Sequence, residues 1–128
     1  MTQHTSLIGG EWVDCGNFHP DVNPANTDDI VGEYSYADAQ AVDQAVSAAN
    51  SARDSWANSS PQVRHDLLAA VGATLAARVE ELGTLLAREE GKTLAEGIGE
   101  TVRAAQIFDF FAGEALRLSG EALPSVRP

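Results

Sequence analysis

The chain has 128 residues, a mass of 13.5 kDa and a formal net charge of −11, and it is long enough for one domain with a hydrophobic core. Only eight residues are lysine or arginine, which argues against binding to nucleic-acid phosphates or to anionic membranes. The single cysteine excludes an internal disulfide and any cysteine-rich zinc site.

Targeting and membrane-spanning signals are not visible in the sequence. The first residues contain neither a basic segment nor a long apolar one. The most apolar run, residues 67–77, is shorter than the ~20 residues that span a bilayer. We therefore expect a cytoplasmic protein.

A small β element is expected at the start of the chain. Residues 7–13 place Gly9 and Gly10 between short apolar segments, and such a pair supplies the positive φ angles of a two-residue hairpin loop. Residues 23–29 are rich in turn formers, and residues 30–35 have the pattern of a strand. Two hairpin arms and one further strand need another element to pack on.

Helices are expected from Asp38 onward. Asp38 is a good N-cap for a first helix, which the sequence Asn58-Ser59-Ser60-Pro61 ends. Ser60 as N-cap and Pro61 as the first helical residue then begin a second helix. After Arg78 the apolar pattern continues to Gly91, either as a third helix or as a bent continuation of the second.

A corner and a long helix follow. Gly91 is a natural left-handed residue after a helix end, and Thr93 with Glu96 has the spacing of a capping box. The next helix is expected to run from about Leu94 to Ser119, before Gly120 and Pro124 stop it.

The long helix is apolar around most of its circumference. Ile107, Phe108, Phe110 and Phe111 widen its apolar stripe, so its second half is expected to be buried on several sides. We interpret these residues as packing residues rather than as an aromatic ligand box. The stripe itself consists of Leu94, Ile98, Val102, Ala105, Ala112 and Leu116.

Two glycine motifs resemble phosphate-binding loops. Gly91-Lys92-Thr93 has the ending of a P-loop, but the first glycine of that motif would fall on Leu86. Gly97-Ile98-Gly99 has the beginning of G-x-G-x-x-G, but the third glycine would fall on Val102 and no strand precedes it. We interpret Gly97 and Gly99 as positions that permit close helix packing.

Other residues with reactive or ligating side chains have simpler interpretations. Cys15 lies in a turn-like segment without a neighbouring base, so we interpret it as a spectator thiol. The acidic pairs are expected to be solvated, and the three histidines lack metal-ligand spacing. We assign no catalytic, cofactor-binding or metal-binding residue in this chain. The acidic pairs are Asp28 with Asp29, Glu80 with Glu81 and Glu89 with Glu90, and the histidines are His4, His19 and His65.

The order and wording of these segments resemble the N-terminal quarter of the aldehyde dehydrogenase family. The resemblance covers nearly the whole chain and is carried by IGGEWV, NPANTDDIVGEY, AVDQAVSAANSARDSWA, the segment from Gln62 to Glu100 and the segment from Ile107 to Pro128. It implies an α/β fold in which a β-hairpin, a strand and three or four helices flank a Rossmann-like cofactor domain. Residues 1–128 would be an incomplete N-terminal portion of the cofactor-binding domain, with a β element at 1–36 and helices at 38–120.

The resemblance also implies a function for a longer parent protein. That parent would use NAD or NADP to oxidise an aldehyde to a carboxylate, and it would be a homo-oligomer. The residues from Glu89 to Pro128 are most similar to alpha-ketoglutaric semialdehyde dehydrogenases, with succinic semialdehyde dehydrogenases next. The catalytic cysteine, asparagine and glutamate of the family would follow Pro128, so the 128-residue chain alone is expected to be inactive.

Two further points stay open at the level of sequence. The family often holds a monovalent cation near a segment resembling residues 21–23, where Glu100 could take part. The alternative function is that of a complete small helical protein, a degenerate relative that binds a partner through the surface from Ile107 to Leu118.

Overall fold

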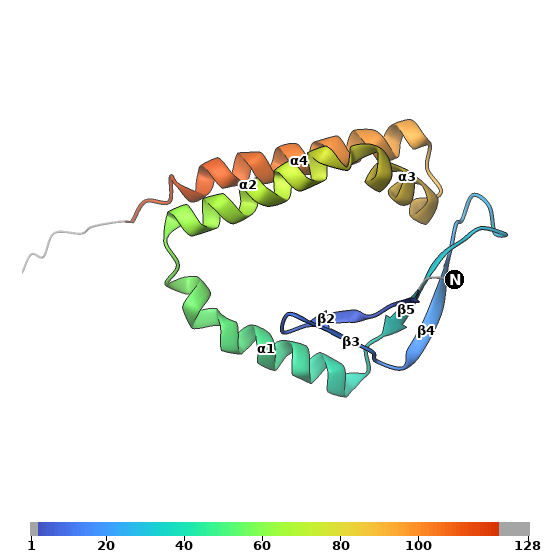
Figure 1. Ribbon diagram of the computed structural model, residues 1–128, viewed down its shortest axis with the longest axis horizontal. Coiled ribbons are helices and arrows are strands. Elements are labelled where there is room, and N and C mark those ends of the chain that lie inside the picture. The colour runs from blue at the N-terminus through green and yellow to red at the C-terminus, as the bar shows by residue number, and fades with distance from the viewer. Residues whose placement is uncertain (1–2, 121–128) are drawn as a thin grey trace, which may run out of the picture.

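Short strands form the first part of the chain and four helices form the rest (Figure 1). The computed structural model describes residues 3–120. The strands are β1 (Gln3–His4), β2 (Ser6–Ile8), β3 (Glu11–Val13), β4 (Asn17–Val22) and β5 (Ile30–Tyr36). The helices are α1 (Ala39–Ala57), α2 (Pro61–Ala77), α3 (Val79–Glu90) and α4 (Leu94–Ala115). This arrangement confirms the predicted α/β class.

The predicted hairpin is present as β2 and β3. The two strands pair antiparallel through the partners Ser6 with Val13 and Ile8 with Glu11. Gly9 and Gly10 form the loop with φ angles of 63° and 91°, which residues with a Cβ rarely adopt.

A second sheet contains the predicted strand β5 and two strands that the sequence did not reveal. Its order is β1-β5-β4, with β1 parallel and β4 antiparallel to β5. Pro20 makes the sequence of β4 less typical of a strand, because proline has no N–H to donate to a neighbouring strand. In the structure β4 lies at the edge of the sheet, where an N–H facing outward needs no partner in the ladder.

The predicted helix boundaries at Asp38, Ser60 and Gly91 are confirmed. The side chain of Asp38 accepts a hydrogen bond from the Ala41 N–H, and that of Ser60 accepts one from the Val63 N–H. Gly91 adopts the left-handed conformation with φ 67°. Arg78, with φ −118° and ψ 22°, separates α2 from α3, so the segment after it is a third helix.

The long helix ends earlier than predicted. Its last residue is Ala115, and the N–H groups of Leu116 and Arg117 bond to carbonyls three residues back. The end of α4 therefore closes with hydrogen bonds of the 3₁₀ type. Gly120 does not adopt the left-handed conformation that would end a helix. Pro124, the other predicted stop, lies outside the described residues.

Small residues hold the helices together. Helix α2 lies beside α4, and α3 crosses the beginning of α4 (Figure 1). A Cβ on Gly97 would collide with the backbone oxygen of Gly83, whereas a Cβ on Gly99 would have open space. The packing interpretation is therefore confirmed for Gly97 and wrong for Gly99. The buried side chains other than glycine in the described part of the chain are Ala41, Thr101, Ala105, Ala112 and Ala115.

The large apolar side chains of the described residues all stay at least partly exposed. Within residues 3–120 none of them is fully buried, and Ile107, Phe110 and Phe111 are 45%, 59% and 54% exposed. The prediction that the second half of α4 is covered on several sides is therefore wrong for this chain. The predicted hydrophobic core is likewise limited to small side chains, because α1 packs mainly on β2 and not on the other helices.

The accessible surface area also shows that the chain is incompletely packed. The chain exposes 9275 Å², whereas a compact monomer of its mass exposes roughly 6,500 Å². The ten residues outside the described range contribute at most about 1,600 Å². An excess of roughly 1,000 Å² remains, which is comparable to one partner's share of a protein interface.

Within residues 3–120, no helix combines the length and apolar character needed to cross a bilayer.

Candidate functional site

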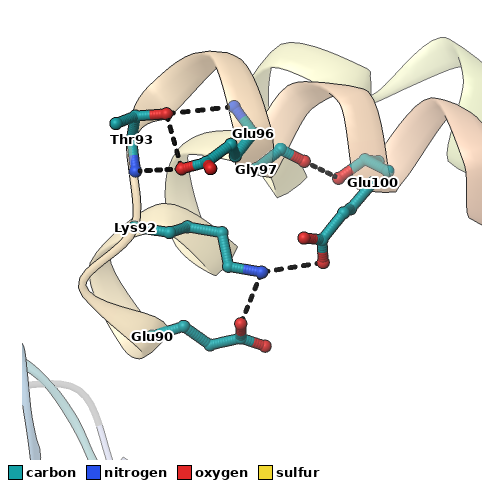
Figure 2. Close-up of polar contacts among 7 residues, drawn as sticks. Glu90, Lys92, Thr93, Glu96, Gly97 and Glu100 are labelled. Carbon is teal, nitrogen blue, oxygen red and sulfur yellow. Dashed lines mark hydrogen bonds and ion pairs between the residues drawn. The ribbon is translucent and has the colours of Figure 1, made fainter.

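The corner between α3 and α4 is a closely hydrogen-bonded unit (Figure 2). The Thr93 hydroxyl accepts from the Glu96 N–H, and the Glu96 carboxylate accepts from the Thr93 N–H at 3.1 Å and from its hydroxyl at 2.8 Å. These bonds lower the pKa of Glu96. The predicted capping box is confirmed, and it fixes where α4 begins.

Lys92 joins the two helices that meet at this corner. Its ammonium group contacts Glu90 at 2.5 Å and Glu100 at 2.7 Å, and both carboxylates raise its pKa, that of Glu100 more strongly (Figure 2). The lysine that resembled a P-loop lysine is thus held by two acids, and a helix rather than a strand precedes it. In this structure Lys92 therefore links the end of α3 to α4 through its two ion pairs.

A second contact fastens the β sheet to the helices. Arg88, near the end of α3, donates two hydrogen bonds to Asp29, at 3.0 Å from Nε and 2.6 Å from Nη2. Asn23 donates to the same carboxylate at 3.1 Å. The bonds from Arg88, and next the bond from Asn23, lower the pKa of Asp29 from 3.8 to about 2.

This contact predicts an acid-sensitive joint. Because the folded pKa of Asp29 is depressed, its stabilising contribution is complete above about pH 4 and is lost as the pH falls toward about 2. Asp29→Asn should lower the thermal midpoint at pH 7 and flatten its decline between pH 4 and 2, as measured by circular dichroism. Asp28→Asn, which removes the neighbouring carboxylate without touching Arg88, serves as control. Equal pH profiles for the two variants would contradict the prediction.

Acidic side chains line a shallow hollow between β4, β5 and the end of α3. Burial and then the charge of Asp21 raise the pKa of Glu89. The resemblance implied a cation near residues 21–23 with Glu100, but Glu100 is held by Lys92. No group of three ligating side chains suited to a metal converges anywhere in residues 3–120. The hollow has a volume of about 490 Å³ and is lined by His19, Pro20, Asp21, Tyr34, Tyr36, Glu89 and Glu90.

The remaining sequence candidates do not come together. Cys15 has the Val13 carbonyl 3.9 Å from its Sγ, and the hollow that it lines contains no histidine, lysine or arginine. His4 stacks on Tyr34 and His19 on Tyr36, while His65 contacts Asp66 on α2. Each of these side chains therefore has its own separate set of neighbours.

One hollow combines apolar residues that the sequence analysis interpreted as packing residues with two polar residues, Arg103 and Gln106, that it did not single out. It has a volume of about 420 Å³ on the outer side of α4, and one arginine and one amide side chain join three apolar ones around it. The helical spacing of Arg103, Gln106, Ile107 and Phe110 was the available signal, but it was hidden because the apolar stripe continues around the helix. The lining residues are Arg103, Gln106, Ile107, Phe110 and Phe111.

Comparison with known sequences identifies a consistent set of relatives. A family model described as aldehyde dehydrogenase family matches residues 12–128. The alpha-ketoglutaric semialdehyde dehydrogenase of Bacillus subtilis is 37% identical over 124 residues, which are 95% of this chain and 25% of that protein. The corresponding enzyme of Haloferax volcanii is 37% identical over 117 residues, 90% of this chain and 24% of that protein.

Solved structures give the same relationship. An NAD-dependent aldehyde dehydrogenase from Sinorhizobium meliloti matches with a TM-score of 0.89 and 32% identity, covering 94% of this chain and 25% of its own. Betaine aldehyde dehydrogenase from Staphylococcus aureus, solved in complex with NAD+, matches with a TM-score of 0.91 and 27% identity, covering 98% and 26%. The chain thus spans about a quarter of the length of these relatives.

Proposed function

The chain belongs to the aldehyde dehydrogenase family, and from that premise we propose that it is the N-terminal scaffold segment of an enzyme that oxidises an aldehyde to a carboxylate with NAD or NADP. The observation that carries the proposal is the close match of nearly the whole chain to a quarter of each solved relative. Such a match means that the strands and helices already have the spacing they have in a complete subunit.

The substrate that we propose is alpha-ketoglutaric semialdehyde. The support is the name of two relatives, each 37% identical to this chain. Within the parent, residues 1–128 would be an incomplete part of the cofactor-binding domain, and the subunits would form a cytoplasmic homo-oligomer.

We propose that the 128-residue chain does not catalyse the reaction by itself. Within residues 3–120, no base lines the hollow at Cys15, and no strand-turn-helix unit carries a glycine loop that could cradle a dinucleotide. The scaffold supplies surface and helix ends on which the remaining parts of a subunit can be placed.

A replacement experiment tests the scaffold function. We define the chimera as the Bacillus subtilis protein in which this chain replaces the matching quarter. The chimera should reduce NAD or NADP when alpha-ketoglutaric semialdehyde is added, as followed by the absorbance of the reduced nicotinamide. The control is the same protein without any replacement quarter, which should be inactive. A chimera that folds but oxidises no aldehyde would count against the proposal.

We expect that the isolated chain does not form a compact, stably folded monomer. We expect it to bind a hydrophobic dye and to be partly unfolded or associated. It exposes roughly 1,000 Å² more surface than a compact monomer, and large apolar side chains such as Phe110 and Phe111 are more than half exposed. It should show no aldehyde oxidation. Dye fluorescence and sedimentation measure these properties. Turnover by the isolated chain, or a sharp two-state melt as a monomer, would contradict this expectation.

The second candidate function is that of a small interaction protein. The observation in its favour is the exposure of Ile107, Phe110, Phe111 and Leu118, the last of which is 65% exposed. Under this function the isolated chain would fold stably and capture a partner without turnover. The same dye, sedimentation and activity measurements therefore separate the two functions.

A further inference from the structure

The cationic side chains of this acidic chain are almost all engaged. Arg64 donates to the backbone carbonyls of Trp56 at 3.1 Å and Ala57 at 2.8 Å. Within residues 3–120, Arg103 is the one lysine or arginine that contacts neither a carboxylate nor a backbone carbonyl. The others form the ion pairs Arg53 with Asp54, Arg78 with Glu81, Arg88 with Asp29, Lys92 with Glu90 and Glu100, and Arg117 with Glu114.

Arg103 has a distinctive position. Among the described residues, its only hydrogen bond is to the side-chain oxygen of Gln106, at the long distance of 3.4 Å. It lies on the face of α4 opposite the buried residues Gly97, Thr101 and Ala105, at the hollow of about 420 Å³. The guanidinium group therefore keeps most of its donors available.

The other side of this hollow is apolar. The rings of Phe110 and Phe111 meet edge to face with centroids 5.3 Å apart, and Ile107 lies beside them on the helix. A guanidinium group next to aromatic and aliphatic side chains suits a ligand that has a carboxylate at one end of a short carbon chain.

We propose that Arg103 binds the carboxylate of the aldehyde substrate and thereby selects aldehydes that carry a negative charge. The inference rests on the proposed function and concerns the substrate class of that enzyme. Arginine matches a carboxylate with two parallel hydrogen bonds, and Gln106 can donate a further one. The carbon chain lies along Ile107 and Phe110, and the aldehyde end extends toward the catalytic part of the subunit. Arg103 takes part in no bond-making step.

Charge complementarity supports this ligand. The chain carries a net charge of −11, which repels an anionic substrate unless one cationic group is kept for it. Within residues 3–120, the acids Glu90, Glu100, Asp29 and Glu81 pair with the cations nearest to them, and no acid pairs with Arg103. An arginine without an acidic partner beside an apolar hollow is the arrangement that a carboxylate ligand requires.

Steady-state kinetics of the chimera test the proposal. Arg103→Gln should raise KM for alpha-ketoglutaric semialdehyde about ten- to hundredfold, the value of a charged hydrogen-bonded pair, with kcat changed less than about twofold. The KM for pentanal, an uncharged aldehyde of the same chain length, should not change. Arg103→Lys should restore part of the loss, because it keeps the charge but not the bidentate geometry. Arg78→Gln, which removes an exposed cation paired with Glu81, is the matched control.

A binding measurement makes the test independent of turnover. Oxidation of the semialdehyde gives 2-oxoglutarate, which keeps the carboxylate that Arg103 would hold. Calorimetric titration of the chimera with 2-oxoglutarate should show weaker binding for Arg103→Gln than for Arg78→Gln.

The outcomes separate this inference from the proposed function. Unchanged KM for the semialdehyde, or equal rises for the semialdehyde and pentanal, would overturn the role of Arg103 and leave the dehydrogenase function standing. A folded chimera that oxidises neither aldehyde would overturn the proposed function, and the binding experiments would then decide on Arg103 alone. Equal binding of 2-oxoglutarate by the Arg103→Gln and Arg78→Gln chimeras would overturn the inference.

Discussion

Gly97→Ala is expected to destabilise the chain by about 1–3 kcal/mol, the usual range for overpacking a close contact. The added Cβ would meet the backbone oxygen of Gly83 and would lie 3.2 Å from the backbone nitrogen of Ala87. Backbone atoms of α3 cannot move aside as a flexible side chain can. The two helices would have to separate where they now touch.

Gly99→Ala is the matched control on the same helix. A Cβ at this position has no atom within 4 Å, and alanine favours a helix over glycine by roughly 0.5–1 kcal/mol. Gly99→Ala should therefore stabilise the chain. Urea unfolding of both variants, followed by the helical circular dichroism signal, measures the two effects. Destabilisation by both variants, or by neither, would show that α3 and α4 do not cross at Gly97.

Gly91→Ala is expected to be the second strongly destabilising change, by about 1–2 kcal/mol from the left-handed conformation alone. Gly91 has φ 67°, and a Cβ would also lie 2.7 Å from Cγ of Pro24 and 3.0 Å from the Ala25 backbone nitrogen. The substitution therefore strains the end of α3 and also pushes away the loop that carries Asn23.

Two companion variants separate these causes. Gly91→Asn keeps the collision but tolerates the left-handed conformation better, so it should lose less stability than Gly91→Ala. Combining Gly91→Ala with Pro24→Ala removes the nearest collision and should recover part of the loss. Urea midpoints of the three proteins give the comparison. Equal stability of Gly91→Ala and the unchanged chain would contradict the left-handed assignment.

Local signals in the sequence were sufficient for the boundaries of the helices. The caps at Asp38, Ser60 and Thr93 and the left-handed Gly91 each depend on residues within one helical turn, so they could be recognised without the fold. The hairpin loop at Gly9 and Gly10 could be recognised for the same reason.

Features that depend on distant residues could not be predicted in this way. Strand β4 is stabilised by its pairing with β5, and its Pro20 is tolerated only because β4 lies at an edge. The contact of Arg88 with Asp29 joins residues that are 59 positions apart. Nothing local distinguishes Gly97, which meets Gly83, from Gly99, which meets nothing.

The candidate ligand hollow shows a further limit of pattern reading. The apolar periodicity of α4 predicted burial, and the same residues instead line an open surface of this chain. Periodicity reports that apolar side chains need cover, but it does not say which part of a protein provides the cover. Arg103 could be recognised as a candidate ligand-binding residue only from the ion pairs of the other cations, which the sequence does not show.

The exposed outer face of α4 has a consequence for protein synthesis. In a relative of the length implied by the Bacillus subtilis match, roughly 370 further residues are translated after this segment, which takes some tens of seconds at about 5–20 residues per second. Throughout that interval Phe110 and Phe111 would be open to chaperones and to neighbouring nascent chains on the same messenger. The charge of −11 then acquires a protective role, because segments that wait for their remaining parts repel one another.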